Sequence, residues 1–285
     1  MRIVYKSEAS NLTTDPKSFS AVSRVVRLAN KHTGAKLVLD MKKVLKFDGN
    51  LNSVYAALNF NLNRSRNTLR ILPEKGKGTD IKLGKDMFGY YSTWECMMEE
   101  TFKSGSTRVY AFDLHDYYSF NDYLLHSAFR KDWKRRIPYD YILSIKQFLR
   151  DLFQNASEHS NSDSPIFVSS SFDGENLRFT MIDCGRGFLE SVGKNSETIV
   201  NEVQAIEYAL DDHKQRAEGK LRSLRLLGDY CVKNNGDLLI ISGGAAVVYD
   251  KNGFHESAWM PGAFRGAAVN LSIKVEVPEF LLAAA

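Results

Sequence analysis

The sequence predicts an α/β protein of two domains, on three observations. Residues 2–72 alternate short apolar strands with helices, and a β-α-β-α-β order favours a mainly parallel sheet with right-handed crossovers. Residues 139–159 have the apolar spacing of a long amphipathic helix. Two strands follow and meet at Asp173-Gly174, a sequence typical of a hairpin turn. We assign residues 1–115 to a first domain with its connector, 116–138 to a linking helix and 139–280 to a second domain.

The composition is that of an ordinary globular protein, with 285 residues, 44% of them hydrophobic and 25% charged. Apolar stretches fall short of the roughly 20 residues that span a bilayer, and no signal peptide is recognisable. We therefore expect a cytoplasmic protein without a membrane partner. The net charge of +4 is mild, so a nucleic-acid partner is not expected. Three scattered cysteines without a CxxC pair favour a reducing compartment and argue against a zinc site.

The elements of the first domain follow in order from local patterns. Strand 3–5 precedes a helix over 16–31, for which Asp15 is the expected N-cap and Pro16 occupies the first turn. Apolar residues predict a buried strand at 36–40. The remaining elements are a helix over 51–64 and a strand over 68–72.

The segment between the two domains is less regular. Residues 73–86 are rich in Gly, Lys and Pro and predict an exposed connector, because they lack the spacing of a phosphate-binding P-loop. We expect residues 88–114 to pack the first domain against the second, and residues 120–133 to be helical. Residues 130–136 are the most basic run. Basic residues around an aromatic can bind nucleic acid, but we favour a solvated helix end, where cations also favour the helix dipole.

The strand that ends at Asp40, followed by residues 44–48 and a helix, resembles the STAS fold of anti-sigma-factor antagonists. In that family a serine that becomes phosphorylated follows the aspartate that matches Asp48. Gly49 and Asn50 stand there in this chain. The resemblance therefore implies the fold and not the phosphorylation switch, and a generic small α/β domain remains the alternative.

The long helix of the second domain carries a polar stripe beside its apolar face. Asp151, Asn155, Glu158 and His159 lie at positions i, i+4, i+7 and i+8, so they share one side of the helix. The amide oxygen of Asn155 suits a magnesium ion that also holds phosphate oxygens. The carboxylate of Asp151 can position or deprotonate a water aimed at a γ-phosphate. A polar helix face turned to water is the alternative.

A second motif, Asp183-Cys-Gly185-Arg-Gly187, comes directly after an apolar strand. Two glycines separated by one residue allow a tight turn and close approach to a ligand. Alone, this pattern is common in turns. Its position after the Asn155 helix and a strand pair favours a nucleotide pocket.

The two motifs in this order resemble the GHKL superfamily, which contains gyrase, the heat-shock ninety chaperone, histidine kinases and MutL. The resemblance covers residues 139–277 and implies a Bergerat-type α/β sandwich with a mixed sheet. It implies that Mg-ATP lies between the Asn155 helix, the Asp183 loop and a lid over residues 191–218. It further implies that Asn155 holds magnesium and that Asp183 binds adenine. Asp151 stands where family ATPases have a glutamate base.

The phosphate side departs from the family pattern. Where the family has a glycine-rich G-x-G-L turn, this chain has Gly219-Lys-Leu-Arg-Ser-Leu224, with Leu221 and Ser223 at glycine positions. Helix amides and nearby cations can still bind an anion. Near the C-terminus we expect strands at 237–242 and 245–250 joined by a turn at Gly243-Gly244. The candidate nucleotide-binding residues are Asn155, Glu158, His159, Asp183, Gly185, Gly187, Lys220, Arg222, Ser223 and Gly266.

These features predict a protein that binds ATP with Mg²⁺ and acts on a protein partner as a conformational switch or slow ATPase, with a homodimer as one expected assembly. Two alternatives stay open: a protein kinase resembling anti-sigma-factor kinases, and a non-catalytic interaction module with a degenerate nucleotide pocket. If the chain is an enzyme, we expect an ATP hydrolase in which Asp151 is the catalytic base.

Overall fold

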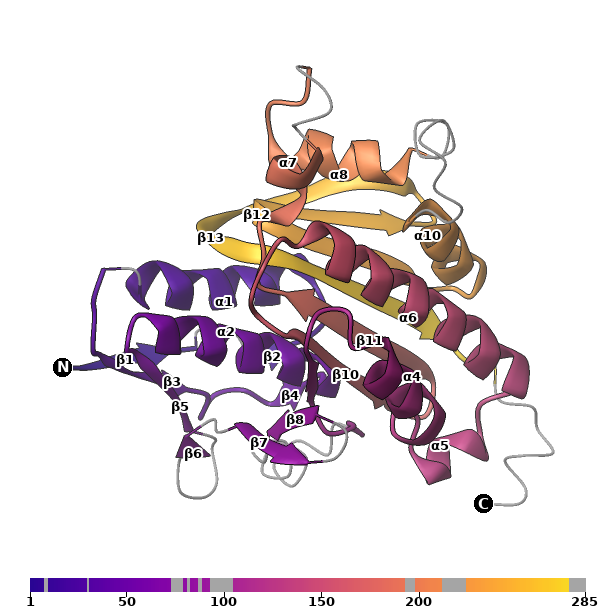
Figure 1. Ribbon diagram of the computed structural model, residues 1–285, viewed down its shortest axis with the longest axis horizontal. Coiled ribbons are helices and arrows are strands. Elements are labelled where there is room, and N and C mark those ends of the chain that lie inside the picture. The colour runs from indigo at the N-terminus through magenta and orange to yellow at the C-terminus, as the bar shows by residue number, and fades with distance from the viewer. Residues whose placement is uncertain are drawn as a thin grey trace.

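The computed structural model is layered: a seven-stranded sheet lies between two groups of helices, and a smaller sheet lies beyond one group (Figure 1). The structure describes residues 1–7, 10–29, 31–72, 79–80, 83–86, 89–92, 105–192, 198–211 and 224–276.

The smaller sheet has three parallel strands, and a short antiparallel strand extends one edge. The strands are β1 (Arg2–Lys6), β3 (Lys36–Asp40), β5 (Thr68–Leu72) and the edge strand β6 (Thr79–Asp80). The crossovers contain α1 (Pro16–Ala29) and α2 (Asn52–Arg64), and they also hold a small pair of strands, β2 (Asn11–Leu12) and β4 (Lys46–Phe47). The predicted parallel β-α-β-α-β order is confirmed.

Local chemistry fixes the start of each crossover helix. Asp15 caps α1 as predicted, because its Oδ1 accepts a hydrogen bond from the Ser18 amide at 2.8 Å. A 3₁₀ turn, η1 (Gly49–Leu51), leads directly into α2. Residues 48–50, to which the STAS resemblance drew attention, therefore form the buried entry to α2.

The larger sheet runs in the order β12-β13-β11-β10-β9-β8-β7, and each described pairing in it is antiparallel. The mixed sheet that we predicted for the second domain is therefore wrong. The reason lies in short hairpin connections, such as Asp173-Gly174, which can join only antiparallel neighbours. The strands are β7 (Leu83–Asp86), β8 (Gly89–Ser92), β9 (Tyr110–Phe112), β10 (Ile166–Phe172), β11 (Asn176–Asp183), β12 (Asp237–Asp250) and β13 (Gly253–Lys274).

Two local predictions differ from the structure. The turn expected at Gly243-Gly244 lies within β12, where the pairing register with β13 shifts at a bulge. Gly243 permits this with a φ of 53°. Residues 83–112 contribute three strands to the larger sheet, although we assigned them to the first domain. Strand pairing therefore joins residues 83–112 to the sheet of the predicted second domain.

One face of the larger sheet is covered by helices of the second domain, and the first hydrophobic core lies beneath them (Figure 1). Within it Phe120 and Phe153 stack with ring centroids 4.1 Å apart and join two of these helices. The predicted linking helix is two helices, because Arg130 is extended and starts a second one. The helices are α4 (Tyr117–His126), α5 (Lys131–Lys134), α6 (Tyr139–His159), α7 (Gly187–Val192), α8 (Glu202–Leu210) and α10 (Leu224–Lys233).

The opposite face of the larger sheet packs against α1 and α2 (Figure 1). This second core combines side chains of the first domain with Phe167, Ile182 and Ile241 from the larger sheet. The first domain is therefore a layer of the same fold. No helix among the described residues has the length and apolar character to cross a bilayer.

Candidate functional site

The polar stripe of α6 lies where the sequence placed it. Apolar residues of the helix such as Ile145 and Phe153 are buried, while Asp151 and Asn155 are half-buried and Glu158 is exposed. Asp151 Oδ1 accepts a hydrogen bond from Gln147 Nε2 at 3.1 Å. The carboxamide of Asn155 has no hydrogen-bond partner among the described residues, so its oxygen and its amine remain available to a ligand.

Glu158 and His159 stand nearer the end of the helix. The Glu158 carboxylate accepts a hydrogen bond from Gln154 Nε2 at 2.8 Å and lies in an exposed position. His159 uses its backbone carbonyl, which accepts a hydrogen bond from Arg186 Nε at 2.8 Å. Arg186 also donates its amide to the Ser160 carbonyl at 2.9 Å. These bonds tie the end of α6 to the Asp183–Gly187 loop and bring the two sequence motifs together.

Asp183 ends β11 with its carboxyl group almost removed from water; the residue is 8% exposed. Its Oδ1 accepts a hydrogen bond from the Gly185 amide at 2.8 Å. Burial raises the pKa of Asp183 to about 6, and backbone donors from Gly185 and Ala267 oppose that rise. A carboxyl group held this way favours a ligand that brings its own hydrogen-bond donor.

Three of the predicted glycines are required by contacts within the protein. A Cβ at Gly185 would stand 2.2 Å from the Ser160 carbonyl oxygen, and a Cβ at Gly266 would stand 2.1 Å from that of Asp183. Gly187 has a φ of 77°, and a Cβ there would stand 2.6 Å from Ser242 Oγ. The motif glycines thus let the loop pass closely between the end of α6 and β13. The sequence argument had assigned this close approach to a ligand.

A clamp that sequence reasoning missed holds the start of α7, and it consists of Glu202 and Ser242. Ser242 Oγ accepts the Phe188 amide and donates to Glu202 Oε2, both at 2.9 Å. The same Glu202 oxygen accepts the Leu189 amide at 3.2 Å. The first amides of a helix lack partners within it, and this clamp supplies them.

The sequence offered a weak signal for the clamp. Glu202 follows Asn201, whose side chain caps α8 by accepting the Gln204 amide at 2.9 Å. An acidic residue at that position is typical of a helix N-terminus and does not indicate a distant contact. The close approach of the clamp also explains Gly243, where a Cβ would stand 2.5 Å from Glu202 Oε1. The clamp thereby bonds α8 to β12 and to the start of α7, which directly follows the Asp183–Gly187 loop.

The predicted phosphate-binding residues Lys220, Arg222 and Ser223 lie outside the described residues, as do residues 193–197 and 212–218 of the predicted lid. They remain predictions. The described part resumes at Leu224, where α10 begins. Tyr230 of α10 packs against Phe148 of α6, with ring centroids 5.1 Å apart.

A surface cavity of about 470 Å³ lies elsewhere, between α8, α10 and the β12–β13 hairpin. None of the predicted site residues that the structure describes lines it. Three of its polar residues bond to one another: Arg225 pairs with Asp229 at 3.1 Å, and Tyr249 donates to the same carboxylate at 2.5 Å. Its polar wall therefore serves the packing of α10 on β12. The lining residues are Glu207, Leu210, Asp211, Arg225, Asp229, Tyr249 and Phe254.

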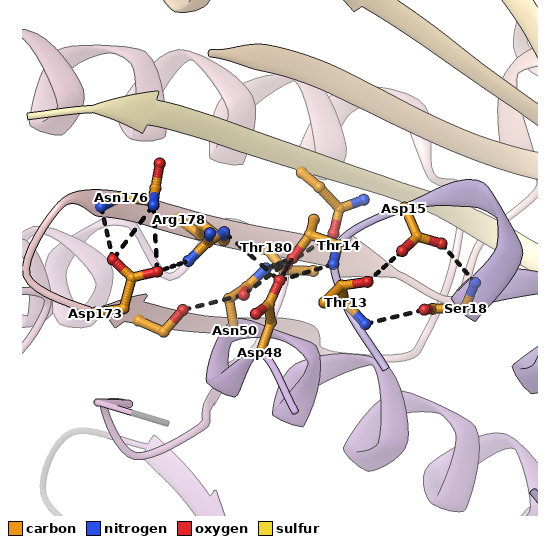
Figure 2. A network of polar contacts seen from close by, with 12 residues as sticks. Thr13, Thr14, Asp15, Ser18, Asp48, Asn50, Asp173, Asn176, Arg178 and Thr180 are labelled. Carbon is orange, nitrogen blue, oxygen red and sulfur yellow. Dashed lines mark hydrogen bonds and ion pairs between the residues drawn. The ribbon is translucent and has the colours of Figure 1, made fainter. Parts of the chain in front are cut away.

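A buried polar network joins the first domain to the larger sheet (Figure 2). At one end Asp48 Oδ2 accepts the Thr14 amide at 2.8 Å and faces Arg178 Nε of β11 at 3.5 Å. Arg178 also pairs with Asp173 at 2.9 Å. Asp48, the residue that matches the STAS aspartate, therefore bonds across the two domains.

Asn50 forms the centre of this network and is fully buried (Figure 2). Its Nδ2 donates to Thr180 Oγ1 at 2.8 Å, and its Oδ1 accepts from Ser171 Oγ at 3.1 Å. Thr180 Oγ1 extends the network by donating a hydrogen bond to Asn270 Oδ1 at 2.7 Å. Thr180 lies three residues before Asp183 on the same strand, so the network reaches the strand that presents the candidate site.

Comparison with known proteins gave no match: no protein family, curated protein or solved structure matches this chain.

Proposed function

We propose that this chain binds Mg-ATP in a pocket of the GHKL type and uses the bound nucleotide to switch its contacts with a protein partner. One observation carries the proposal: the hydrogen bonds between the end of α6 and the Asp183–Gly187 loop. They join the end of the helix that carries Asn155 to the loop that begins at the buried Asp183, which supports a shared site for the two motifs.

The chemistry of Asp183 fits an adenine ring. The exocyclic amine of adenine is a donor, and a buried carboxylate gains from any donor that replaces lost water. Because Asp183 is nearly dry, a small neutral donor group suits it better than a hydrated cation does. In the family that the motifs resemble, the matching aspartate binds adenine.

The chemistry of Asn155 fits magnesium. Mg²⁺ at a nucleotide keeps several waters and needs only one or two oxygens from the protein in addition to phosphate oxygens. The amide oxygen of Asn155 can supply one of them, and its half-buried position on α6 leaves it open to a ligand. Bound Mg²⁺ would neutralise phosphate charge beside the helix.

The proposal is tested by calorimetric titration of the full chain with ATP and ADP, with and without Mg²⁺. We expect binding that Asp183→Asn abolishes, and a magnesium effect that Asn155→Ala removes. Asn63→Ala is the matched control, because it removes the same side chain at an exposed position of α2. Absence of nucleotide binding by the wild-type chain at millimolar concentration would refute the proposal and favour the non-catalytic interaction module.

Hydrolysis is the further step that Asp151 could support. Its carboxylate is half-buried, lies one turn before Asn155, and is held by Gln147. We expect Asp151→Asn to retain nucleotide binding and to lose turnover. Unchanged turnover in that variant would exclude Asp151 as the base. Transfer of labelled phosphate from ATP to this chain or to a partner would instead favour the protein-kinase alternative.

A further inference from the structure

Residues 130–150, which include α5 and the first half of α6, are rich in positive charge. Residues 130–150 contain seven cations and two carboxylates, a net charge of +5. Where the fold gathers such cations on one surface, they indicate a polyanionic partner.

The structure separates the structural cations of this segment from the exposed ones. Arg130 pairs with Asp132 at 3.0 Å, and Arg136 reaches the Gly174 carbonyl at 3.4 Å. Trp133, the aromatic residue of the basic run, is buried in the core at 3% exposure. Lys134 is exposed, and its Nζ reaches the Leu125 carbonyl at the end of α4.

The fold adds two cations from α6 to Lys134. Lys146 interacts electrostatically with both Lys134 and Arg150, and after burial these two cations are what lower its pKa. Lys146 and Arg150 are four residues apart on one helix, a spacing at which like charges are destabilising. Arg150 is bonded to Asn121 of α4 at 2.8 Å. The cluster therefore spans three helices and gains stability if an anion binds to it.

Exposed aromatic and apolar side chains extend the cluster at both ends. Tyr139 and Leu143 precede Lys146 and Arg150 at one-turn spacing on α6 and are 69% and 47% exposed. On α4, Tyr118 lies one turn before Asn121 and is 86% exposed. The stripe from Tyr139 to Arg150 covers about 16 Å of helix.

We infer that this cationic face, formed by Tyr118, Lys134, Tyr139, Leu143, Lys146 and Arg150, binds single-stranded nucleic acid. Phosphates would pair with the three cations, and exposed tyrosine rings offer stacking surfaces for bases. An acidic polypeptide would satisfy the cations but would leave the two rings without a role. This differs from the expectation from the sequence, which set nucleic acid aside because the net charge is mild and the basic run was interpreted as a solvated helix end.

The test is fluorescence anisotropy of the full chain, without ATP, with labelled dT20, U20 and a 20-base-pair duplex over a range of KCl concentrations. We expect the single strands to bind more tightly than the duplex. Binding through three phosphates predicts that log K falls against log salt with a slope of about −2. Tyr139→Ala should weaken single-strand binding roughly ten-fold through lost stacking.

A matched pair of variants separates this face from net charge. Lys134→Gln with Arg150→Gln removes two cations from the face, whereas Lys17→Gln with Lys251→Gln removes two exposed cations elsewhere. The first pair should lower the salt slope and the affinity, and the second should change neither. Equal losses in both pairs, tighter binding of the duplex, or equal competition by polyglutamate would overturn the inference. None of these outcomes depends on nucleotide binding at Asp183.

Discussion

At the scale of one residue, the burial of Asp183 makes the stability of the folded chain depend on pH. Its pKa is raised from 3.8 to about 6 in the folded chain because burial disfavours the charged form. Between these two values the folded state holds more protons than the unfolded state, so stability falls as pH rises through this window. The cost is complete above pH 6 and amounts to about 3 kcal/mol at most. A site that retains such a cost is typical of a functional carboxyl group.

We predict that Asp183→Asn removes this pH-dependent loss. In urea unfolding between pH 4 and pH 7, the difference in stability between wild type and variant should change by up to about 3 kcal/mol, to the disadvantage of the wild type as pH rises. Asp237→Asn is the comparison, because burial also raises the pKa of Asp237 to about 6 at a distance from the loop. A constant difference between wild type and Asp183→Asn over this range would contradict the prediction.

The glycines show what residue-level reasoning can and cannot reach. Gly185 and Gly187 are predicted as site residues because their spacing allows close approach to a ligand, and Gly266 is predicted from the family resemblance. The structure confirms the close approach, but its partners are Ser160, Ser242 and Asp183 of the same chain. A sequence identifies a position that cannot carry a side chain; it does not identify what occupies the space.

At the scale of elements, the sequence predicts the features that depend on local interactions and misses those that depend on contacts distant in sequence. The helix α6 and the hairpin between β10 and β11 agree with the sequence pattern because apolar spacing and turn residues are local signals. The sequence predicts a turn at Gly243-Gly244, where the structure has a bulge, because a Gly-Gly pair is compatible with either feature. The antiparallel sheet and the Glu202–Ser242 clamp depend on contacts distant in sequence, which no local pattern records.

The clamp leads to a prediction for α7. Ser242→Ala removes the acceptor of the Phe188 amide and one partner of Glu202, so we expect a loss of about 1 kcal/mol in stability. Hydrogen exchange at the amides of Phe188 and Leu189 should accelerate, while exchange in β10 stays unchanged. Ser272→Ala on β13 is the control, because its hydroxyl has no partner among the described residues. Equal exchange in both variants would exclude the clamp as a support of α7.

At the scale of the whole molecule, the two predicted domains share one interior. The parallel order of the first domain was predictable from alternating strands and helices, but its place against the larger sheet was not. That placement depends on apolar side chains of α1 and α2 that meet Phe167 and Ile182, and on the buried network centred on Asn50 (Figure 2). The sequence shows an asparagine in the turn before a helix, but it does not show to which strand that asparagine bonds.

The network predicts how the molecule unfolds. Asn50→Ala leaves Thr180 and Ser171 without their buried partner, and each buried polar group left unsatisfied costs about 1–3 kcal/mol. We expect a loss of about 2–4 kcal/mol in total stability. Hydrogen exchange in α1 and α2 should then become faster than exchange in β10 and β11, whereas in the wild type we expect all four to open together at low urea concentration.

The control for this experiment is Asn63→Ala, because Asn63 is an exposed asparagine near the end of α2, the helix that follows the turn of Asn50. It removes the same side chain without touching the network between the first domain and the larger sheet, so we expect wild-type exchange in all four elements. If Asn50→Ala and Asn63→Ala gave the same hydrogen exchange in these elements, the polar network would not help to hold the first domain against the larger sheet. Apolar packing between α1, α2 and the larger sheet would then hold them together alone.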